Sequence, residues 1–502
     1  MEANCGVVIG ERSPRGGFRF LGIPFAAPPI GPNRWRAPVP PEPWNGEFDA
    51  TTFPPAPMQK PPGPDNLMAQ FSFASPPESE ISEDCLYLNI WAPESIAEKQ
   101  TRGLPVIFWI YGGGHRVGSA SHPSTWGEGL ASRGAIVVAA NYRLGAFGYL
   151  AHPALSEEGG TSGNYASLDL IAALRWVRNN IAAFGGNPDC ITLYGQSVGA
   201  AHVNVLLASP LAKGLMDRAI VVSGGRMAGG PIGRIKALKE AEDEGQALMA
   251  QLGAMSLEEI RALPAGKVVE IQSNWNIVQD GLVLDTQPEQ KFAANVHSSI
   301  PILAGFTADD SAPYFSPQWA SLAGLQDFAA SFGETESEFH QIYPADTEQA
   351  ALAQSYTIRR DIAFAYQAWR QAKAMAVGAR APAWMFCLEQ APPLPVNRRF
   401  HEPVPPNGYG AYHGADVWYA FGCFDAVPWA WSVADRQVHE LMATAFVRFA
   451  ETGNPGDVNG QAWPQLGEED QALMLSSHPR VEPLPNRAGL RFFARPYFSP
   501  GS

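Results

Sequence analysis

The sequence predicts an α/β fold in which a central, mostly parallel and twisted sheet is flanked by helices. The run 104–111 is apolar without interruption, and 135–141 and 191–194 are further strand-length apolar runs. Between the last two, residues 166–184 place apolar side chains at helical spacing. Strand, helix and strand at this spacing form a βαβ unit, which makes the sheet mostly parallel.

The other elements follow in chain order and are separated by Pro and Gly clusters. Residues 6–46 alternate short apolar runs with Pro and Gly, which predicts strands of a small N-terminal meander. The helix expected over 436–451 is closed by Thr452-Gly453-Asn454-Pro455. We also expect strands over 82–91, 219–223, 301–305 and 383–388, and helices over 238–263 and 361–377.

The length and composition indicate a globular protein with a large core. The chain has 502 residues and is 46% hydrophobic, a length for which about three domains are possible. Single α/β domains with long insertions reach the same size, and we expect one domain over 1–502. The Pro-rich stretch within 54–80 is a candidate gorge-rim loop, although a purely structural loop fits equally well. Candidate cap or regulatory insertions lie at 226–275 and 311–400.

Charge and hydropathy exclude two classes of partner. The net charge of −14 argues against a nucleic-acid binder, which needs a basic face to displace counterions. The longest apolar runs are of strand length and fall far short of the ~18 residues that span a bilayer. We therefore expect neither a nucleic-acid partner nor a membrane span, and a monomer or a homodimer.

The first residues and the cysteines bear on localisation and on metal sites. Residues 1–4 lack the basic and apolar regions of an export signal, so localisation stays open: cytoplasmic as given, or exported if a leader was removed. The five cysteines are scattered, odd in number and without metal-ligand spacing. We expect buried thiols, no disulfides and no metal site. The cysteines are Cys5, Cys85, Cys190, Cys387 and Cys423.

The sequence Gly195-Gln196-Ser197-Val198-Gly199 follows the strand at 191–194 and leads into a helix-like run. In a nucleophile elbow the serine is held in a strained turn, and the flanking glycines avoid collisions with the neighbouring strand and helix. The helix start also points the amide of Val198 at negative charge that forms beside Ser197. The alternative is an ordinary β-turn, because a five-residue pattern arises by chance in a glycine-rich chain.

Three glycines, Gly112-Gly113-Gly114, directly follow the apolar strand at 104–111. Without side chains, their amides can approach a ligand closely, so this stretch predicts the second half of an oxyanion hole. A flexible turn is the alternative, but no polar loop residue precedes the glycines.

Further sequence blocks span nearly the whole chain. They are F-L-G-I-P-F (20–25), S-E-D-C-L-Y-L-N-I-W (82–91), W-I-Y-G-G-G (109–114), N-Y-R-L-G-A-F-G (141–148), the region from Gly163-Asn164 to 184–188, G-Q-S-V-G (195–199), the stretch around His413, and F-A-E-T-G-N-P (449–455) followed by Trp463-Pro464. In this order they resemble the type-B carboxylesterase/lipase family of α/β-hydrolases, which includes bacterial esterases and the cholinesterases. The resemblance implies an α/β-hydrolase fold whose long insertions form a cap and gorge.

The resemblance also implies a carboxylic-ester hydrolase with a Ser–acid–His triad and a covalent acyl-serine intermediate. Ser197 matches the nucleophile and His413 the base. The acid falls in G-F-T-A-D-D-S (305–311), where the family usually has glutamate, and Asp310 occupies that place. Because aspartate is one methylene shorter, Asp309 stays an alternative partner.

The remaining family positions complete the expected site. Gly113, Gly114 and the amide of Val198 match the oxyanion hole. No metal or organic cofactor is implied, and the partner is a small-molecule ester. Arg34 with Glu83 and Arg143 with Asp169 match buried ion pairs of structural importance.

Two departures from the family pattern concern the substrate. Gln196 replaces the usual glutamate before the serine, which removes a negative charge and should disfavour cationic leaving groups. His115 and Arg116 follow the glycines where an aromatic residue normally lines the acyl pocket. They predict an acyl part that carries oxygens or a carboxylate, because a buried carboxylate must be paired. Alternatively, Arg116 faces solvent and His115 only hydrogen-bonds a loop.

Three functions follow from these observations. The first is a general carboxylesterase. The second is an esterase specialised for carboxylate-bearing acyl groups, such as tricarballylate esters of the fumonisin type or half-esters of dicarboxylates. The third is a non-catalytic esterase-like binding protein, which the retention of Ser197, His413 and an acid disfavours.

Overall fold

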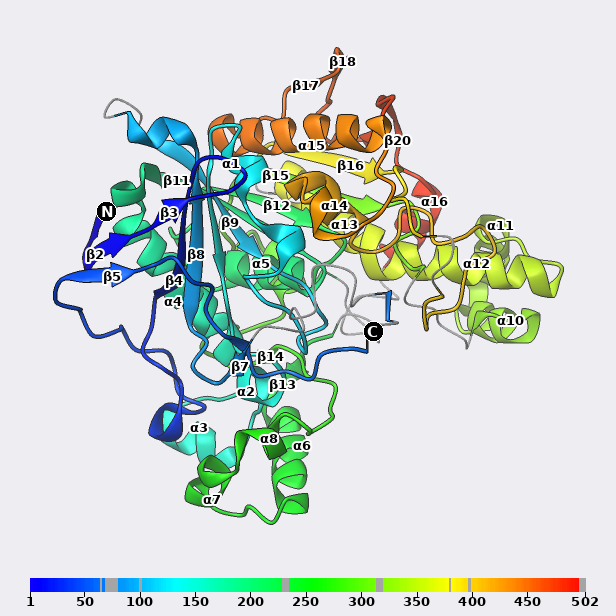
Figure 1. Cartoon of the computed structure of the whole chain (residues 1–502). Helices are drawn as coiled ribbons and strands as arrows, with labels where there is room; N and C mark the ends of the chain where they lie inside the picture. Colours follow the sequence, from blue (N-terminus) through cyan, green and yellow to red (C-terminus); the bar gives the residue numbers. More distant parts are fainter. Residues whose placement is uncertain are drawn as a thin grey trace.

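The computed structural model describes residues 1–63, 66–67, 80–98, 102–227, 234–312, 319–378, 381–395 and 399–495. Within them an 11-stranded sheet forms the centre of the molecule (Figure 1). Its strands, in spatial order, are β20 (Arg480–Pro483), β19 (Gln471–Leu475), β16 (Ala383–Leu388), β15 (Ile302–Thr307), β12 (Arg218–Val222), β11 (Gly186–Gln196), β9 (Leu104–Ile110), β10 (Ile136–Ala140), β8 (Tyr87–Ala92), β4 (Phe18–Pro24) and β3 (Glu11–Arg12).

The strands from β10 to β19 in this order run parallel, and only the strands at the two margins are antiparallel. This arrangement confirms the predicted mostly parallel α/β fold. Strands β10, β12 and β15 are buried along almost their whole length. Helix α15 (Val433–Thr452) covers one side of the sheet, and α4 (Tyr165–Asn180) and α5 (Val198–Ala208) lie on the other (Figure 1).

The predicted βαβ unit is confirmed. Helix α4 passes into a 3-10 turn at Ile181–Phe184 and ends at Gly185, whose φ of 89° suits a residue without a Cβ. Strand β11 then lies parallel to β9, with Ile191 beside Val106. The expected strand over 82–91 is shorter, because β8 begins only at Tyr87. In place of the expected N-terminal meander, β1 (Glu2–Ala3), β2 (Gly6–Ile9) and β5 (Glu47–Asp49) form a separate small sheet, whereas β3 and β4 join the central sheet.

Two helix predictions differ from the structure. The expected helix over 238–263 is two helices, α6 (Leu238–Gln251) and α7 (Leu257–Ala262), because Gly253 has a φ of 75° and Ser256 caps α7. The helix expected from residue 361 begins earlier, with α12 (Glu348–Arg360). It continues through a wider π-helical turn at Asp361–Ala365 into α13 (Tyr366–Lys373).

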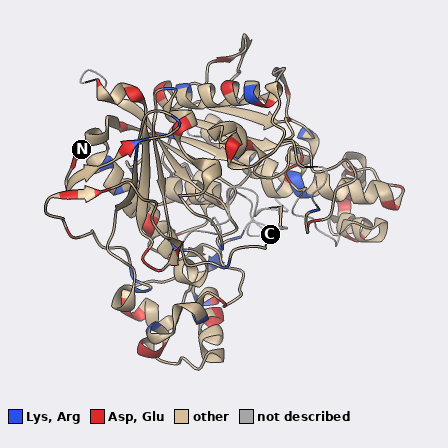
Figure 2. Cartoon of the chain, viewed as in Figure 1, with Lys and Arg blue, Asp and Glu red and all other residues tan. Residues whose placement is uncertain are grey.

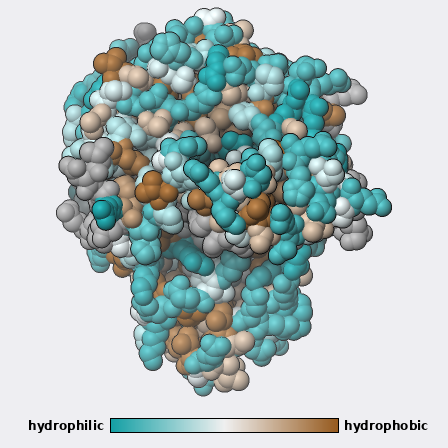
Figure 3. Space-filling view, turned by 90° about the vertical axis from the view of Figure 1, so that its right-hand side faces the viewer, coloured by the Kyte–Doolittle hydropathy of each residue, from teal (hydrophilic) through white to brown (hydrophobic). Residues whose placement is uncertain are grey.

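The predicted insertions contribute helices outside the central sheet. Helices α6, α7 and α8 (Ala265–Val268) form a lobe at the bottom of Figure 1, and α10 (Leu322–Ala330), α11 (Glu336–Ile342) and α12 lie at its right. The lower lobe projects from the body in the space-filling view (Figure 3). Acidic and basic side chains are interspersed over these outer helices, whereas the sheet carries few (Figure 2).

The predicted structural ion pairs are confirmed. The guanidinium of buried Arg143 donates to Asp169 through Nε at 2.8 Å and Nη2 at 2.6 Å. Arg34 Nε donates to Glu83 at 2.6 Å. All five cysteines are buried free thiols. In the described part of the chain, every helix is too short or too polar to cross a bilayer.

Candidate active site

Ser197 occupies a strained turn between β11 and α5. Its φ of 57° and ψ of −125° lie in a region that L-residues rarely adopt. A Cβ on Gly195 would lie 2.5 Å from the carbonyl oxygen of Gly199, and one on Gly199 would lie 2.0 Å from that of Ile110. Only glycines fit at both positions, so the turn has the geometry expected of a nucleophile elbow and not of an ordinary β-turn.

Asp310 and His413 form a buried contact. Nδ1 of His413 lies 2.6 Å from Oδ1 of Asp310, and neither side chain is exposed. Asp310 follows β15, and its second oxygen accepts a hydrogen bond from the amide of Thr307 at 3.1 Å. The carboxylate therefore fixes the imidazole with its proton on Nδ1, which leaves Nε2 with a lone pair that can accept a proton.

Asp309 has a different role. Its Oδ2 accepts the amide of Ala411 at 2.9 Å, and its own amide donates to the Ala411 carbonyl at 3.0 Å. These bonds tie the loop after β15 to the segment that precedes His413. Of the two aspartates, Asp310 is therefore the one whose carboxylate contacts the imidazole.

The other face of His413 meets the residue before Ser197. Nε2 of His413 lies 3.4 Å from Nε2 of Gln196, whose side chain is fully buried. The ring of Phe364 packs against the imidazole at a centroid distance of 4.5 Å. The imidazole thus lies beside the turn that carries Ser197. Among the residues that the structure describes, the Ser197 hydroxyl makes no hydrogen bond; catalytic hydrogen bonds often tighten only in the complex with substrate.

Gly113 and Gly114 follow β9, and their amides donate no backbone hydrogen bond within the described part of the chain. Gly113 and Gly114 have φ values of 108° and 65°, and a Cβ on Gly113 would lie 1.9 Å from the Val117 carbonyl oxygen. Val198 is the first residue of α5, so its amide has no acceptor within the helix. Three backbone donors of this kind can stabilise a developing oxyanion.

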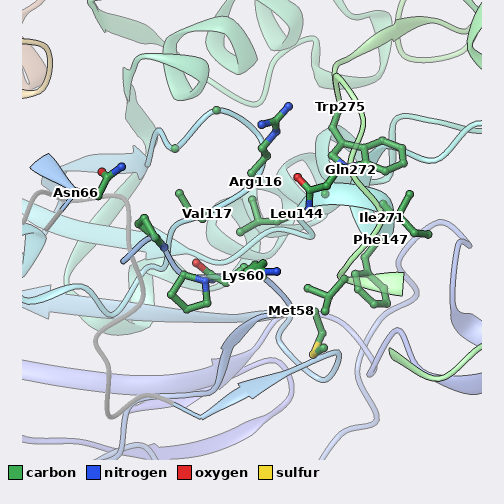
Figure 4. A pocket seen from close by; sticks show the side chains of 18 residues that line it. Met58, Lys60, Asn66, Arg116, Val117, Leu144, Phe147, Ile271, Gln272 and Trp275 are labelled. Carbon is green, nitrogen blue, oxygen red and sulfur yellow. The ribbon is translucent and has the colours of Figure 1, made fainter. Parts of the chain in front are cut away.

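A cavity of about 480 Å³ reaches Gly113 and Gly114 (Figure 4). Residues of both the predicted gorge-rim loop and the insertion at 226–275 line it. Arg116 and Trp275 lie on one side and Lys60 and Met58 on the other. The labelled lining residues are Met58, Lys60, Asn66, Arg116, Val117, Leu144, Phe147, Ile271, Gln272 and Trp275.

The structure separates His115 from Arg116. Arg116 is exposed and donates to the carbonyl of Ser273 at 2.8 Å, as the solvent-facing alternative expects. His115 is buried, with Nδ1 2.7 Å from the hydroxyl of Tyr149 and Nε2 3.4 Å from Nη2 of Arg226. The Tyr149 hydroxyl also lies 2.7 Å from Nε2 of His202. His115 therefore belongs to an internal polar cluster and not to a loop contact.

Comparison with known proteins identifies the family. The family model described as "Carboxylesterase family" matches residues 1–493. The chain belongs to the carboxylesterase family. Its members hydrolyse carboxylic esters, so this protein is a carboxylesterase by family membership.

Relatives and solved structures agree with this assignment. The carboxylesterase is 33% identical over 493 residues to fumonisin B1 esterase of Sphingopyxis macrogoltabida. The aligned region covers 91% of this chain and 83% of the relative. The carboxylesterase is also 33% identical over 489 residues to para-nitrobenzyl esterase of Bacillus subtilis, with 93% of each chain covered. A solved structure of PNB esterase superposes with a TM-score of 0.81 at 30% identity and covers 98% of this chain and 99% of the other.

Sequence reasoning missed several residues of this carboxylesterase site. Tyr149, His202 and Arg226 form the polar cluster with His115, and Phe364 packs on His413. For Arg226 one signal was present: a cation directly follows Ser223-Gly224-Gly225 at the end of an apolar strand. The others lie inside helices or far along the chain, and nothing in their local sequence marks them.

The protonation state of Asp416 is unusual in this carboxylesterase. It lies in α14 (Ala415–Phe421), just after His413, and accepts a hydrogen bond from the Tyr194 hydroxyl at 3.3 Å. Burial, with a smaller contribution from the charge of Asp310, raises the pKa of Asp416 to about 8. The folded state therefore holds a neutral carboxyl group at pH 7.

Neutral Asp416 makes stability fall as the pH rises. Between about pH 4, the pKa of an unfolded aspartate, and pH 8, the folded state binds a proton that the unfolded state has lost. From this group we expect the free energy of unfolding to decrease by about 3–4 kcal/mol between pH 5 and pH 8. In Asp416→Asn this decrease should shrink, as measured by Tm at both pH values. An identical pH dependence in the two proteins would contradict the neutral carboxyl group.

Proposed function

We propose that this carboxylesterase cleaves carboxylic esters through an acyl-serine intermediate, with Ser197 as nucleophile, His413 as general base and Asp310 as the orienting acid. The observation that carries the proposal is the buried 2.6 Å contact between His413 and Asp310 beside the strained Ser197 turn. The matched family and the fold support it. The proposal requires no metal or organic cofactor.

In the proposed mechanism, Nε2 of His413 removes the Ser197 proton as Oγ attacks the ester carbonyl carbon. The negative charge moves to the carbonyl oxygen, where the amides of Gly113, Gly114 and Val198 would donate to it; removing one such donor costs about 10²–10³ in rate. The protonated imidazole then gives its proton to the leaving alcohol as the C–O bond breaks. Asp310, buried with His413, stabilises the imidazolium in between.

Deacylation repeats these steps with water. Nε2 accepts a proton from a water molecule whose oxygen attacks the acyl carbon, and the same proton returns to Oγ as the acyl–serine bond breaks. The products are the carboxylic acid and the free enzyme. The side-chain nitrogen of Gln196 lies 3.4 Å from Nε2 of His413, so the proposed base has to exchange this contact for the Ser197 hydroxyl before the attack.

Labelling with diisopropyl fluorophosphate tests the proposal directly. We expect stoichiometric loss of p-nitrophenyl butyrate hydrolysis. Mass spectrometry should locate the phosphoryl adduct on the peptide that contains Ser197. The activated serine reacts because His413 removes its proton, so His413→Ala should label far more slowly. A folded protein that neither hydrolyses the ester nor takes the label would overturn the proposal in favour of an esterase-like binding protein.

Two observations favour a narrower function, hydrolysis of esters whose acyl part carries a carboxylate. A relative with 33% identity is named fumonisin B1 esterase. In this chain, moreover, the half-buried Arg226 contacts the residue that follows the proposed oxyanion glycines.

A further inference from the structure

Arg226 lies on the segment that packs against the Ser197 turn. It follows β12 through Ser223, Gly224 and Gly225. A Cβ on Gly224 would lie 2.1 Å from the carbonyl oxygen of Ser197, so the backbones are in direct contact there. The Arg226 amide donates to Oδ1 of Asn204 in α5 at 2.6 Å, which fixes the start of its side chain.

The guanidinium of Arg226 extends towards the other side of the site. Its Nη2 donates to Oδ1 of Asn276 at 2.9 Å and lies 3.4 Å from Nε2 of His115. His115 directly follows Gly113-Gly114, so the arginine bridges the segment on Ser197 and the segment of the proposed oxyanion hole. Its Nε is buried without an acceptor among the described residues, and Nη1 makes no hydrogen bond with them either.

Arg226 also has no carboxylate partner in the described part of the chain, unlike comparable arginines. The side chains of Arg34, Arg143 and Arg360 are 8%, 3% and 14% exposed, and each is paired with a carboxylate. Burial lowers the pKa of Arg226, and only the phenol of Tyr149 acts to raise it. Arg226 is half-buried, but its Nε is buried without an acceptor among the described residues. A largely desolvated cation without a counter-ion is costly to the fold, which indicates that a ligand supplies the missing anion.

The groups around Arg226 remain neutral and do not compete for that anion. Burial, then the neighbouring His202 and Arg226, lower the pKa of His115 well below its ordinary value. Burial, with a contribution from Arg226, lowers the pKa of His202 to about 3. The Tyr149 hydroxyl bonds both imidazoles. His115, His202 and Tyr149 are therefore neutral polar groups, and Arg226 is the only one of these four side chains that carries a charge.

We propose that Arg226 is a specificity-determining residue that binds a carboxylate in the acyl part of the substrate, so that half-esters of dicarboxylic acids are preferred over neutral esters of equal length. This inference rests on the proposed acyl-serine function and assigns the substrate class of the same site. The anion-binding role expected for Arg116 is thereby assigned to Arg226, because Arg116 is exposed and donates to the carbonyl of Ser273.

Two matched esters test the proposal. Monoethyl glutarate differs from ethyl valerate only by a carboxylate in place of the terminal methyl group. Hydrolysis is followed by pH-stat titration, and the readout is the ratio of kcat/KM for the two esters. A charge-assisted contact predicts a wild-type ratio of about 10–100. Arg226→Met should lower the ratio to about 1 or below, and Arg226→Lys should give an intermediate value because it keeps the charge.

Arg116→Met tests the rival cation, because Arg116 lines the cavity that reaches Gly113 and Gly114. If Arg226 binds the carboxylate, the ratio in this variant should stay within about threefold of wild type, since exposed charges contribute little. A wild-type ratio near 1, or an equal loss for both esters in a folded Arg226→Met protein, would overturn the proposal. So would a collapse of the ratio in Arg116→Met alone. Tm measurements verify that each variant is folded. If Arg226→Met fails to fold, the kcat/KM ratio of Arg226→Lys is compared with that of the wild type instead.

A second readout does not depend on turnover. Free glutarate should slow labelling of Ser197 by diisopropyl fluorophosphate in the wild type and much less in Arg226→Lys or Arg226→Met, whereas valerate should have little effect on any of them. Labelling that glutarate does not slow refutes the role of Arg226 and leaves the acyl-serine mechanism intact. Absence of labelling altogether refutes that mechanism, and this inference with it.

Discussion

Replacing Ser197 by alanine is expected to lower kcat for p-nitrophenyl butyrate by about 10⁶-fold, the loss that follows removal of a triad nucleophile. Without Oγ no acyl-enzyme forms, and only oxyanion stabilisation and substrate binding remain to accelerate attack by water. The turn itself should persist, because alanine has the same Cβ at the strained φ of 57°. Steady-state kinetics with an active-site titration measure the loss.

Ser223→Ala provides the matched control. Ser223 directly follows the neighbouring strand β12, also at a positive φ of 53°, and its hydroxyl is buried without a hydrogen-bond partner among the described residues. Removing such a hydroxyl is nearly neutral for a protein, so activity should stay within about tenfold. Retention of activity in Ser197→Ala, or an equal loss in both variants, would rule out Ser197 as the nucleophile.

Replacing Asp310 by asparagine should lower kcat by about 10⁴-fold, as in triads whose acid becomes an amide. The amide cannot stabilise the imidazolium, and its NH₂ group favours the His413 tautomer with the proton on Nε2, which cannot act as a base. The expected signature is a large loss of kcat with a small change in KM, because the acid does not touch the substrate.

Asp309→Asn distinguishes the two adjacent aspartates. The carbonyl oxygen of its amide can still accept from the Ala411 N–H that Asp309 now binds at 2.9 Å, so we expect less than a tenfold loss. The same assay on both variants decides between them. If Asp309→Asn is the more damaging change while its Tm is unaltered, the acid has been misassigned.

The central sheet and the Ser197 turn could be predicted because their signals are local. An apolar run, two glycines at fixed offsets and a helix-like run together favour a tight strand–turn–helix at Ser197 over an ordinary β-turn. The choice between Asp309 and Asp310 could not be made in this way. Both follow the same strand, and only the pairing of Asp309 with Ala411 turns Asp310 towards His413.

The role of Arg226 was beyond local reasoning. Its chemistry depends on Asn276 and His115, which lie far from it in the sequence, and on the lack of a carboxylate partner among the described residues. A sequence shows which charged residues exist, but not which of them lack an oppositely charged neighbour in the folded protein. For the same reason the sequence left open whether Arg116, adjacent to His115 in the chain, contacts the acyl group or faces solvent; in the structure it is exposed at the rim of the cavity that reaches Gly113 and Gly114.

Two segments that line the cavity of Figure 4 lie apart from the proposed triad and oxyanion residues. Half of the lining comes from 58–62 and 269–275, and both segments lie outside the strands that hold the elbow, whereas Gly113 and Gly114 belong to the other half. Exchanging either segment between homologues should therefore alter which alcohols are accepted while leaving turnover chemistry in place. Diversification of this scaffold can proceed by grafting loops, and laboratory evolution for new leaving groups is best targeted there.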